Sequence, residues 1–132
     1  MDPAHARGAT SEFYAAAWWS SRGYELFWPV GSGASIVDFI AVKGGQKKRV
    51  QVKTGSIWTK SHAKYLSVSI INRGRRCKRR AFDYLSVVSP YGWMLNIPTS
   101  ALPTRQQFHI RLSDDHHPRQ ENWLRWMTTL SH

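Results

Sequence analysis

The chain has 132 residues, the length of one domain, and its 42% hydrophobic residues and seven Trp exclude a disordered chain. A formal net charge of +11, with only eight carboxylates, indicates a polyanionic partner, and nucleic acid is favoured over an anionic membrane surface. The single cysteine, Cys77, excludes an internal disulfide framework and a cysteine-based zinc site. The sequence shows neither a signal peptide nor a run of membrane-spanning length, so we expect an intracellular, cytoplasmic protein without a membrane partner.

The N-terminal third predicts one helix followed by a hairpin of strands. Residues 1–9 are small and polar and are expected to be a flexible N-terminus, before a single domain over 10–132. Residues 10–22 favour a helix that ends at a glycine. After it, strands are predicted over the ranges 24–30, 36–42 and 49–54, with a glycine-rich loop at 31–35 and a glycine turn at 44–45.

The rest of the chain predicts further strands and a closing helix. The expected strands are 64–71, 83–90 and 92–98. A C-terminal helix is expected over about 118–130, with Trp123 and Trp126 on it as a candidate subunit interface. The order of elements indicates an α/β (α+β) fold, a mixed central sheet flanked by helices.

Acidic and basic residues are segregated along the sequence, and this singles out one carboxylate. Thirteen of the nineteen Lys and Arg lie within residues 43–80, and no acid occurs between Asp38 and Asp83. Asp38 lies on a predicted strand whose hairpin partner, RVQVKT, presents Gln51 and Lys53 on one face. The plainer interpretation is a solvent-facing polar edge of a hairpin.

The same residues also have the functional groups that phosphodiester hydrolysis needs. Asp38 would supply anionic oxygens to a hard divalent cation, and the amide of Gln51 a neutral oxygen. Lys53 would orient a water or stabilise charge on a phosphate, and Glu12 on the first helix would add a second carboxylate. A first-turn acid that interacts with the helix dipole is the alternative for Glu12.

The ordered series Glu12, Asp38 and Gln51-Val52-Lys53 resembles the active-site pattern D…(E/Q)xK of the PD-(D/E)XK nuclease superfamily. It is most similar to the subgroup with glutamine in place of the acid, found in cyanobacterial group I intron homing endonucleases. In order over residues 10–102, the shared features read VDFIAV, QVKT, KYLSVSI, FDYLSVV and WMLNIP. The resemblance implies a restriction-endonuclease-like core and a DNA endonuclease, from a prokaryotic or phage context, that uses Mg²⁺ or Mn²⁺ held by Glu12, Asp38 and Gln51.

Two features depart from the usual pattern. Val37 stands where the superfamily commonly has a proline, and Gln51 removes one ligand charge. The chain also resembles Holliday junction resolvases of the same fold, in which the loop at 31–35 would contribute Ser32; these normally keep a glutamate in ExK. A non-catalytic DNA-binding relative is a further alternative.

A dense basic segment indicates contact with the DNA backbone. Residues 73–80 contain six cations and no acid, which favours phosphate binding over a solvated hairpin tip. The expected DNA-binding residues are Ser32, Lys60, Lys64, Arg73, Arg75, Arg76, Lys78, Arg79 and Arg80. Because one such site cuts one strand, cleavage of both strands predicts a homodimer or homotetramer.

Overall fold

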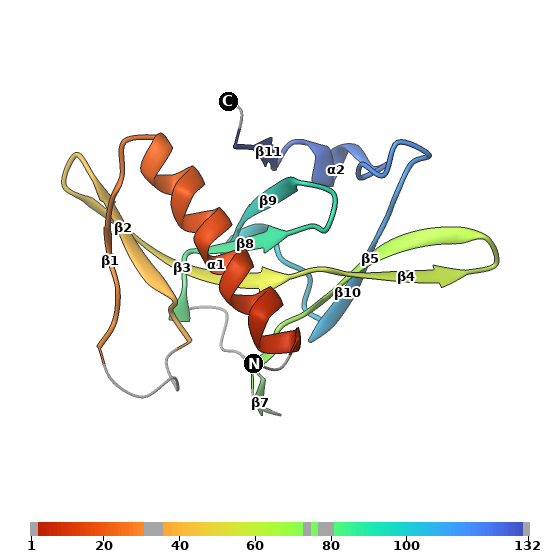
Figure 1. The fold of residues 1–132 in the computed structure, drawn as a ribbon, viewed down its shortest axis with the longest axis horizontal. Helices are drawn as coiled ribbons and strands as arrows, with labels where there is room; N and C mark the ends of the chain where they lie inside the picture. Colours follow the sequence, from red (N-terminus) through yellow and green to blue (C-terminus); the bar gives the residue numbers. More distant parts are fainter. Residues whose placement is uncertain (1–2, 31–35, 73–74, 77–80, 131–132) are drawn as a thin grey trace.

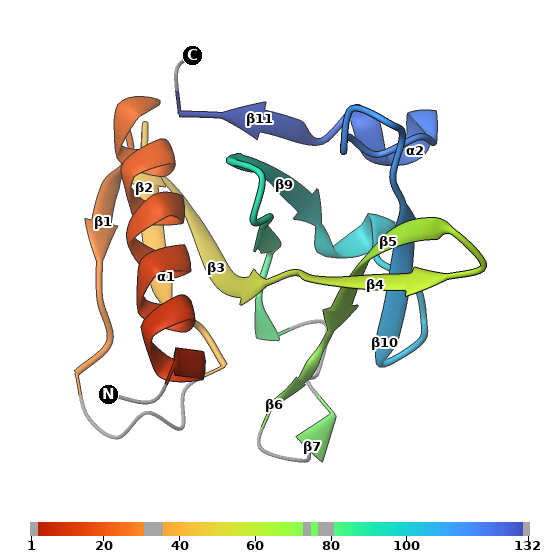
Figure 2. The same cartoon turned by 45° about the vertical axis from the view of Figure 1, so that its right-hand side comes forward.

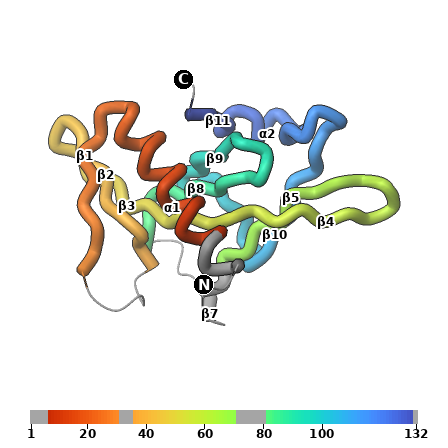
Figure 3. Tube along the Cα trace, viewed as in Figure 1, coloured from red at the N-terminus to blue at the C-terminus, as the bar shows by residue number. Residues whose placement is uncertain are grey.

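The computed structural model describes residues 3–30, 36–72, 75–76 and 81–130 (Figure 1). The helical elements are α1 (Pro3–Ser21), the 3-10 turn η2 (Thr99–Ala101) and α2 (Glu121–Leu124). The strands are β1 (Glu25–Phe27), β2 (Phe39–Lys43), β3 (Gln46–Thr54), β4 (Ser56–Lys60), β5 (Ala63–Ser69), β6 (Ile71–Asn72), β7 (Arg75–Arg76), β8 (Tyr84–Val88), β9 (Trp93–Pro98), β10 (Gln107–Arg111) and β11 (Met127–Thr129). Figure 3 follows the path of the chain through them.

A six-stranded sheet in the order β1-β2-β3-β8-β9-β11 forms the centre of the fold. The β3–β8 pair is parallel and the other pairs are antiparallel, so the expected mixed sheet is confirmed. A parallel pair needs a crossover connection, which is usually a helix. Here the chain between β3 and β8 includes strands β4 to β7 instead, and β4 and β5 join β10 in a second, three-stranded sheet.

The two faces of the central sheet are covered differently. Along α1, Ala15 and Trp19 lie four residues apart on one stripe and pack on Val50 and Val52 of β3. The opposite face packs against the three-stranded sheet, whose strands β4, β5 and β10 lie on the side away from α1 in Figure 2. Within the described residues, one long helix and one small sheet thus flank the central sheet, in place of helices on both sides. No described helix is long and apolar enough to span a membrane.

Helix α1 starts earlier than the sequence predicts. It begins at Pro3, so most of the segment expected to be flexible over 1–9 is helical. Proline suits the first turn of a helix, because the N–H that it lacks would have no partner there. The helix still ends at the expected place, where Gly23 adopts a φ of 90°.

The expected C-terminal helix over 118–130 is wrong. Only the four residues of α2 are helical, and β11 then pairs with β9 in antiparallel register. Strand β9 would otherwise leave an unpaired edge, and the two β-branched threonines of β11 suit a strand. Trp123 is buried and stacks on Phe108 at 5.3 Å, and Trp126 packs partly buried against the same core cluster. Trp123 is therefore a core residue, and a subunit interface on this segment stays a prediction.

The β2–β3 hairpin forms as the glycine pair predicts, and β4 is an addition. Gly44 and Gly45 have φ values of 58° and 80°, which only glycine adopts readily at both positions of a tight hairpin turn. Strand β4 was not expected, because all five of its residues are exposed and lack an apolar alternation. This segment is a strand because its backbone pairs with that of β5.

Candidate active site

Helix α1 is fixed on β3 through a stripe of buried residues. Ser11, Ala15 and Trp19 follow at intervals of four and are 4%, 0% and 2% exposed. The Ser11 hydroxyl hydrogen bonds to the Thr54 hydroxyl at the end of β3 (2.7 Å), and Trp19 Nε1 donates to Ser86 Oγ (3.1 Å). Glu12 is the next residue of α1, and its side chain reaches Asp38, directly before β2.

Asp38 is held against the same strand by two hydrogen bonds. It lies directly before β2 rather than inside it, a correction to the expected position. Its backbone N–H donates to the Val50 carbonyl (2.8 Å), and its carboxylate Oδ2 accepts the Val52 N–H (2.6 Å). These two bonds, to Val50 and to Val52, hold Asp38 alongside the stretch of β3 that includes Gln51. The expected proximity of Asp38 and Gln51 is therefore present in the structure.

Gln51 and Lys53 share one face of β3, while the flanking valines Val50 and Val52 face α1. Gln51 is only 3% exposed, and Lys53 is partly buried. Burial raises the pKa of the Asp38 carboxyl, and the positive charge of Lys53 is one of the contributions that oppose this rise. The amide of Gln51 and the ammonium of Lys53 therefore lie near Asp38, a carboxylate that is distant from both in the sequence.

Glu12 and Asp38 form a carboxyl pair across α1 and the start of β2. Burial, a hydrogen bond to Asp38 and the charge of Asp38 raise the pKa of Glu12 to about 7. Burial also raises the pKa of Asp38, and the Val52 N–H, the Glu12 hydrogen bond and Lys53 oppose that rise. Two adjacent carboxyl groups cannot both ionise at little cost, so Glu12 holds the shared proton up to about neutral pH.

The donor set of this site fits a hard divalent cation. A cation can replace the proton between the two carboxyls, and the Gln51 amide offers a neutral oxygen beside them. The described residues contain no group of three or more His, Cys, Asp and Glu that could hold a metal ion. Mg²⁺ does not require one, because it commonly binds through one or two carboxylates and keeps several waters.

The residues expected to bind DNA are distributed differently. Lys60 and Lys64 lie on the β4–β5 hairpin, which projects away from α1 in Figures 1 and 2. Lys60 lies over the ring of Trp58, and Lys64 approaches His116. The backbone of Arg75 and Arg76 forms β7, which pairs with β6. The remaining expected residues fall outside the described part of the chain; they are Ser32, Arg73, Lys78, Arg79 and Arg80.

A second aspartate supports β3 from its other neighbour. Asp83, directly before β8, accepts the Arg49 N–H (2.7 Å) and the Arg49 guanidinium (3.2 Å), which lowers the pKa of Asp83. The sequence indicates no structural role for the Arg49–Asp83 pair or for the Ser11–Thr54 hydrogen bond. No local pattern signals either contact, because each joins residues more than 30 positions apart.

This arrangement of a mixed central sheet, a long helix on one face and a small sheet on the other is a restriction-endonuclease-like fold. One solved structure similar to this chain is that of a bacterial homing endonuclease, I-Ssp6803I, with a TM-score of 0.72. The match covers 96% of this chain and 88% of the other at 17% sequence identity, so it establishes the shared fold. No protein-family model and no curated protein sequence matches the chain.

Proposed function

We propose that the chain is a metal-dependent DNA endonuclease that hydrolyses phosphodiester bonds in double-stranded DNA. The observation that carries the proposal is the Glu12–Asp38 carboxyl pair beside Lys53, on a fold shared with a bacterial homing endonuclease. The net charge of +11 agrees with a polyanionic substrate.

In this proposal each residue of the site has a separate task. Glu12, Asp38 and Gln51 would hold a divalent cation, Mg²⁺ or Mn²⁺, which supplies positive charge beside the scissile phosphate. The Asp38 carboxylate is oriented in advance by the Val52 N–H, so little reorganisation accompanies binding. The ammonium of Lys53 would orient the attacking water and stabilise the charge that develops on the phosphate. Cleavage of both strands would need two copies of the chain.

The test is cleavage of supercoiled plasmid with Mg²⁺, with Mn²⁺ and with EDTA. We expect nicking or cutting that needs the metal and is lost in Asp38→Asn and Lys53→Met. Lys47→Met is the matched control, since it removes an exposed lysine from the other end of β3. If both site variants cut as well as the parent, the site assignment is wrong.

A four-way junction at the same concentration separates the endonuclease from a resolvase of this fold. Preferential cutting of the junction would show that the substrate is a four-way junction rather than a duplex, with the same metal-dependent hydrolysis. Salt-sensitive binding without cleavage under any metal condition would identify a non-catalytic DNA-binding module.

A further inference from the structure

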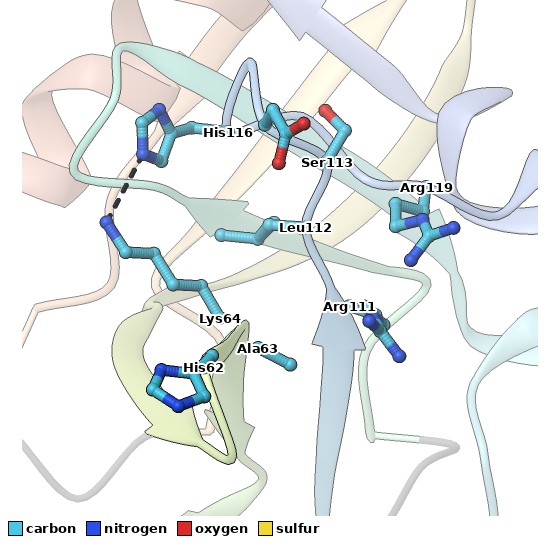
Figure 4. A pocket seen from close by; sticks show the side chains of 9 residues that line it. His62, Ala63, Lys64, Arg111, Leu112, Ser113, His116 and Arg119 are labelled. Carbon is cyan, nitrogen blue, oxygen red and sulfur yellow. Dashed lines mark hydrogen bonds between the residues drawn. The ribbon is translucent and has the colours of Figure 1, made fainter.

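A second polar site lies at the far end of the β4–β5 hairpin. A pocket of about 470 Å³ opens between the hairpin turn and the segment 111–119 (Figure 4). Its lining includes none of the four candidate active-site residues. We propose that this pocket binds a phosphate group of a nucleic-acid backbone at a distance from the scissile bond. The inference rests on the proposed function, because it assigns the pocket to the same DNA.

Two arginines are forced together at one wall of the pocket. The Arg119 N–H donates to the Arg111 carbonyl (2.9 Å), next to the antiparallel bridge between Leu112 and Pro118. Like charges directly opposite in such a pair are destabilising unless an anion lies between them. Neither arginine forms an ion pair with a residue that the structure describes. The local backbone therefore holds two guanidinium groups at a place that an anion would stabilise.

The opposite wall presents Lys64 of β5 beside a turn formed by residues 113–117. Lys64 Nζ lies 3.4 Å from His116 Nε2, the contact drawn in Figure 4. The His116 ring stacks on Tyr91 with centroids 4.5 Å apart, and its backbone carbonyl accepts the Trp93 indole N–H (2.8 Å). The Ser113 N–H closes the turn by donating to the His117 carbonyl. This wall is thus held in place before any ligand arrives.

The charge of the lining selects the ligand. Lys64, Arg111 and Arg119 face a single carboxylate, Asp114, so positive charge remains in excess. Guanidinium groups match the oxygens of a phosphate in a bidentate geometry. The pocket is open on the same hairpin that carries the exposed Lys60, and the whole chain is strongly basic. These features favour a backbone phosphate of a polynucleotide.

The experiment compares the salt dependence of DNA binding in matched variants. The site variant is Arg111→Gln/Arg119→Gln, and Lys64→Gln is a second, independent one. The control, Lys47→Gln/Arg125→Gln, also removes two exposed positive charges but outside the pocket. Binding of a labelled duplex is followed by fluorescence anisotropy in EDTA over a range of KCl concentrations. Circular dichroism and thermal unfolding verify that each variant folds.

The parent and the control should share one slope of log K against log salt. The slope of each site variant should be shallower by about 0.9 for every phosphate contact removed. Equal slopes for all proteins would overturn the inference, even if the parent cleaves DNA. A shallower slope in the site variants of a parent that never cleaves would support the pocket while rejecting the proposed catalysis.

Inorganic phosphate distinguishes a free anion from a backbone phosphate. The ring signals of His62 and His116, both in the lining, serve as NMR probes in the parent and in the arginine variant. Phosphate-induced shifts in the parent that vanish in the variant, together with the changed DNA slope, support the proposal. Such shifts with an unchanged DNA slope would assign the pocket to a free anion and overturn the polynucleotide assignment.

Discussion

The Asp38 carboxylate accepts the backbone N–H of Val52 at 2.6 Å, so one side chain serves both the sheet and the candidate site. The bond replaces a ladder contact at the point where the chain enters β2. It also fixes the carboxylate beside Gln51 and within hydrogen-bonding reach of Glu12. Stability and chemistry are therefore coupled at this residue, and substitutions there can separate them.

Removal of the Asp38 carboxylate should lower both the folding stability and the binding of a metal ion. Replacement by the isosteric amide should lower only the binding of the metal ion. Asp38→Ala leaves the Val52 N–H without its acceptor, and the loss of a bond to a charged group lowers the free energy of unfolding by about 1.5–3 kcal/mol. Asp38→Asn keeps an acceptor oxygen but loses the ligand charge. We expect near-parental denaturant stability for Asp38→Asn without a rise in melting temperature on addition of Mg²⁺. A parental Mg²⁺ response in this variant would contradict the metal site.

Lys53→Met should abolish cleavage while the fold and cation binding remain. Lys53 is partly buried, and its charge opposes the rise that burial causes in the pKa of Asp38, but an ammonium is not an oxygen ligand. We expect the melting temperature of Lys53→Met to rise with Mg²⁺ as in the parent, and plasmid cleavage to fall by at least about 100-fold, within the range for loss of an acid–base or electrostatic group. Parental cleavage rates would assign Lys53 to structure alone.

The Glu12 carboxyl should make stability depend on pH in the absence of metal. Its pKa rises from an ordinary value of 4.5 to about 7 in the folded chain, so the folded state binds more protons between these values. The contribution to stability is complete below pH 4.5 and is lost as the pH rises through about 7. Glu12→Gln should flatten this part of the profile of melting temperature against pH in EDTA.

Asp83→Asn is the control for this pH profile. The pKa of Asp83 is lowered by Arg49, so its contribution is present above its ordinary value of 3.8 and is lost as the pH falls below it. Its effect should therefore appear only at acid pH, outside the Glu12 range. A Glu12→Gln profile that still falls between pH 4.5 and 7 would assign the dependence to other groups.

The Ser11–Thr54 hydrogen bond should stabilise the packing of α1 on the end of β3. Thr54→Val removes one partner and leaves the buried Ser11 hydroxyl unsatisfied, a loss of about 1–3 kcal/mol in the free energy of unfolding. The double variant Ser11→Ala/Thr54→Val removes both partners and should recover part of that loss. A double-mutant cycle by urea denaturation measures this coupling, and additive effects would show that the bond contributes nothing.

Gly55, directly after the QVKT sequence, is where the chain passes from the central sheet to the small one. A Cβ at this position would lie 2.6–2.9 Å from the side chain of Leu66, which is fully buried. Gly55→Ala should lower the free energy of unfolding by about 1–3 kcal/mol through overpacking. Gly44→Ala tests the strain of a positive φ instead, because nothing lies within 4 Å of its Cβ position.

Local sequence determines the hairpin that carries most of the candidate site. The Gly44–Gly45 turn fixes the register of β2 on β3, and alternation along RVQVKT sends Gln51 and Lys53 to one face. The mixed sheet follows from the order of such segments, and the fold shared with the solved structure of a homing endonuclease confirms it. These properties depend on neighbours in sequence or on periodicity, so they can be predicted from the sequence alone.

Only the tertiary structure decided the contacts between distant segments. The Glu12–Asp38 pair and the Arg111–Arg119 wall depend on how α1 and the segment 111–119 pack, which no periodicity encodes. The C-terminal segment has a helical pattern, yet Met127–Thr129 form a strand that pairs with the otherwise unpaired edge of β9. Sequence alone thus determined the residues available to the site, and long-range packing decided which of them meet and how their charges interact.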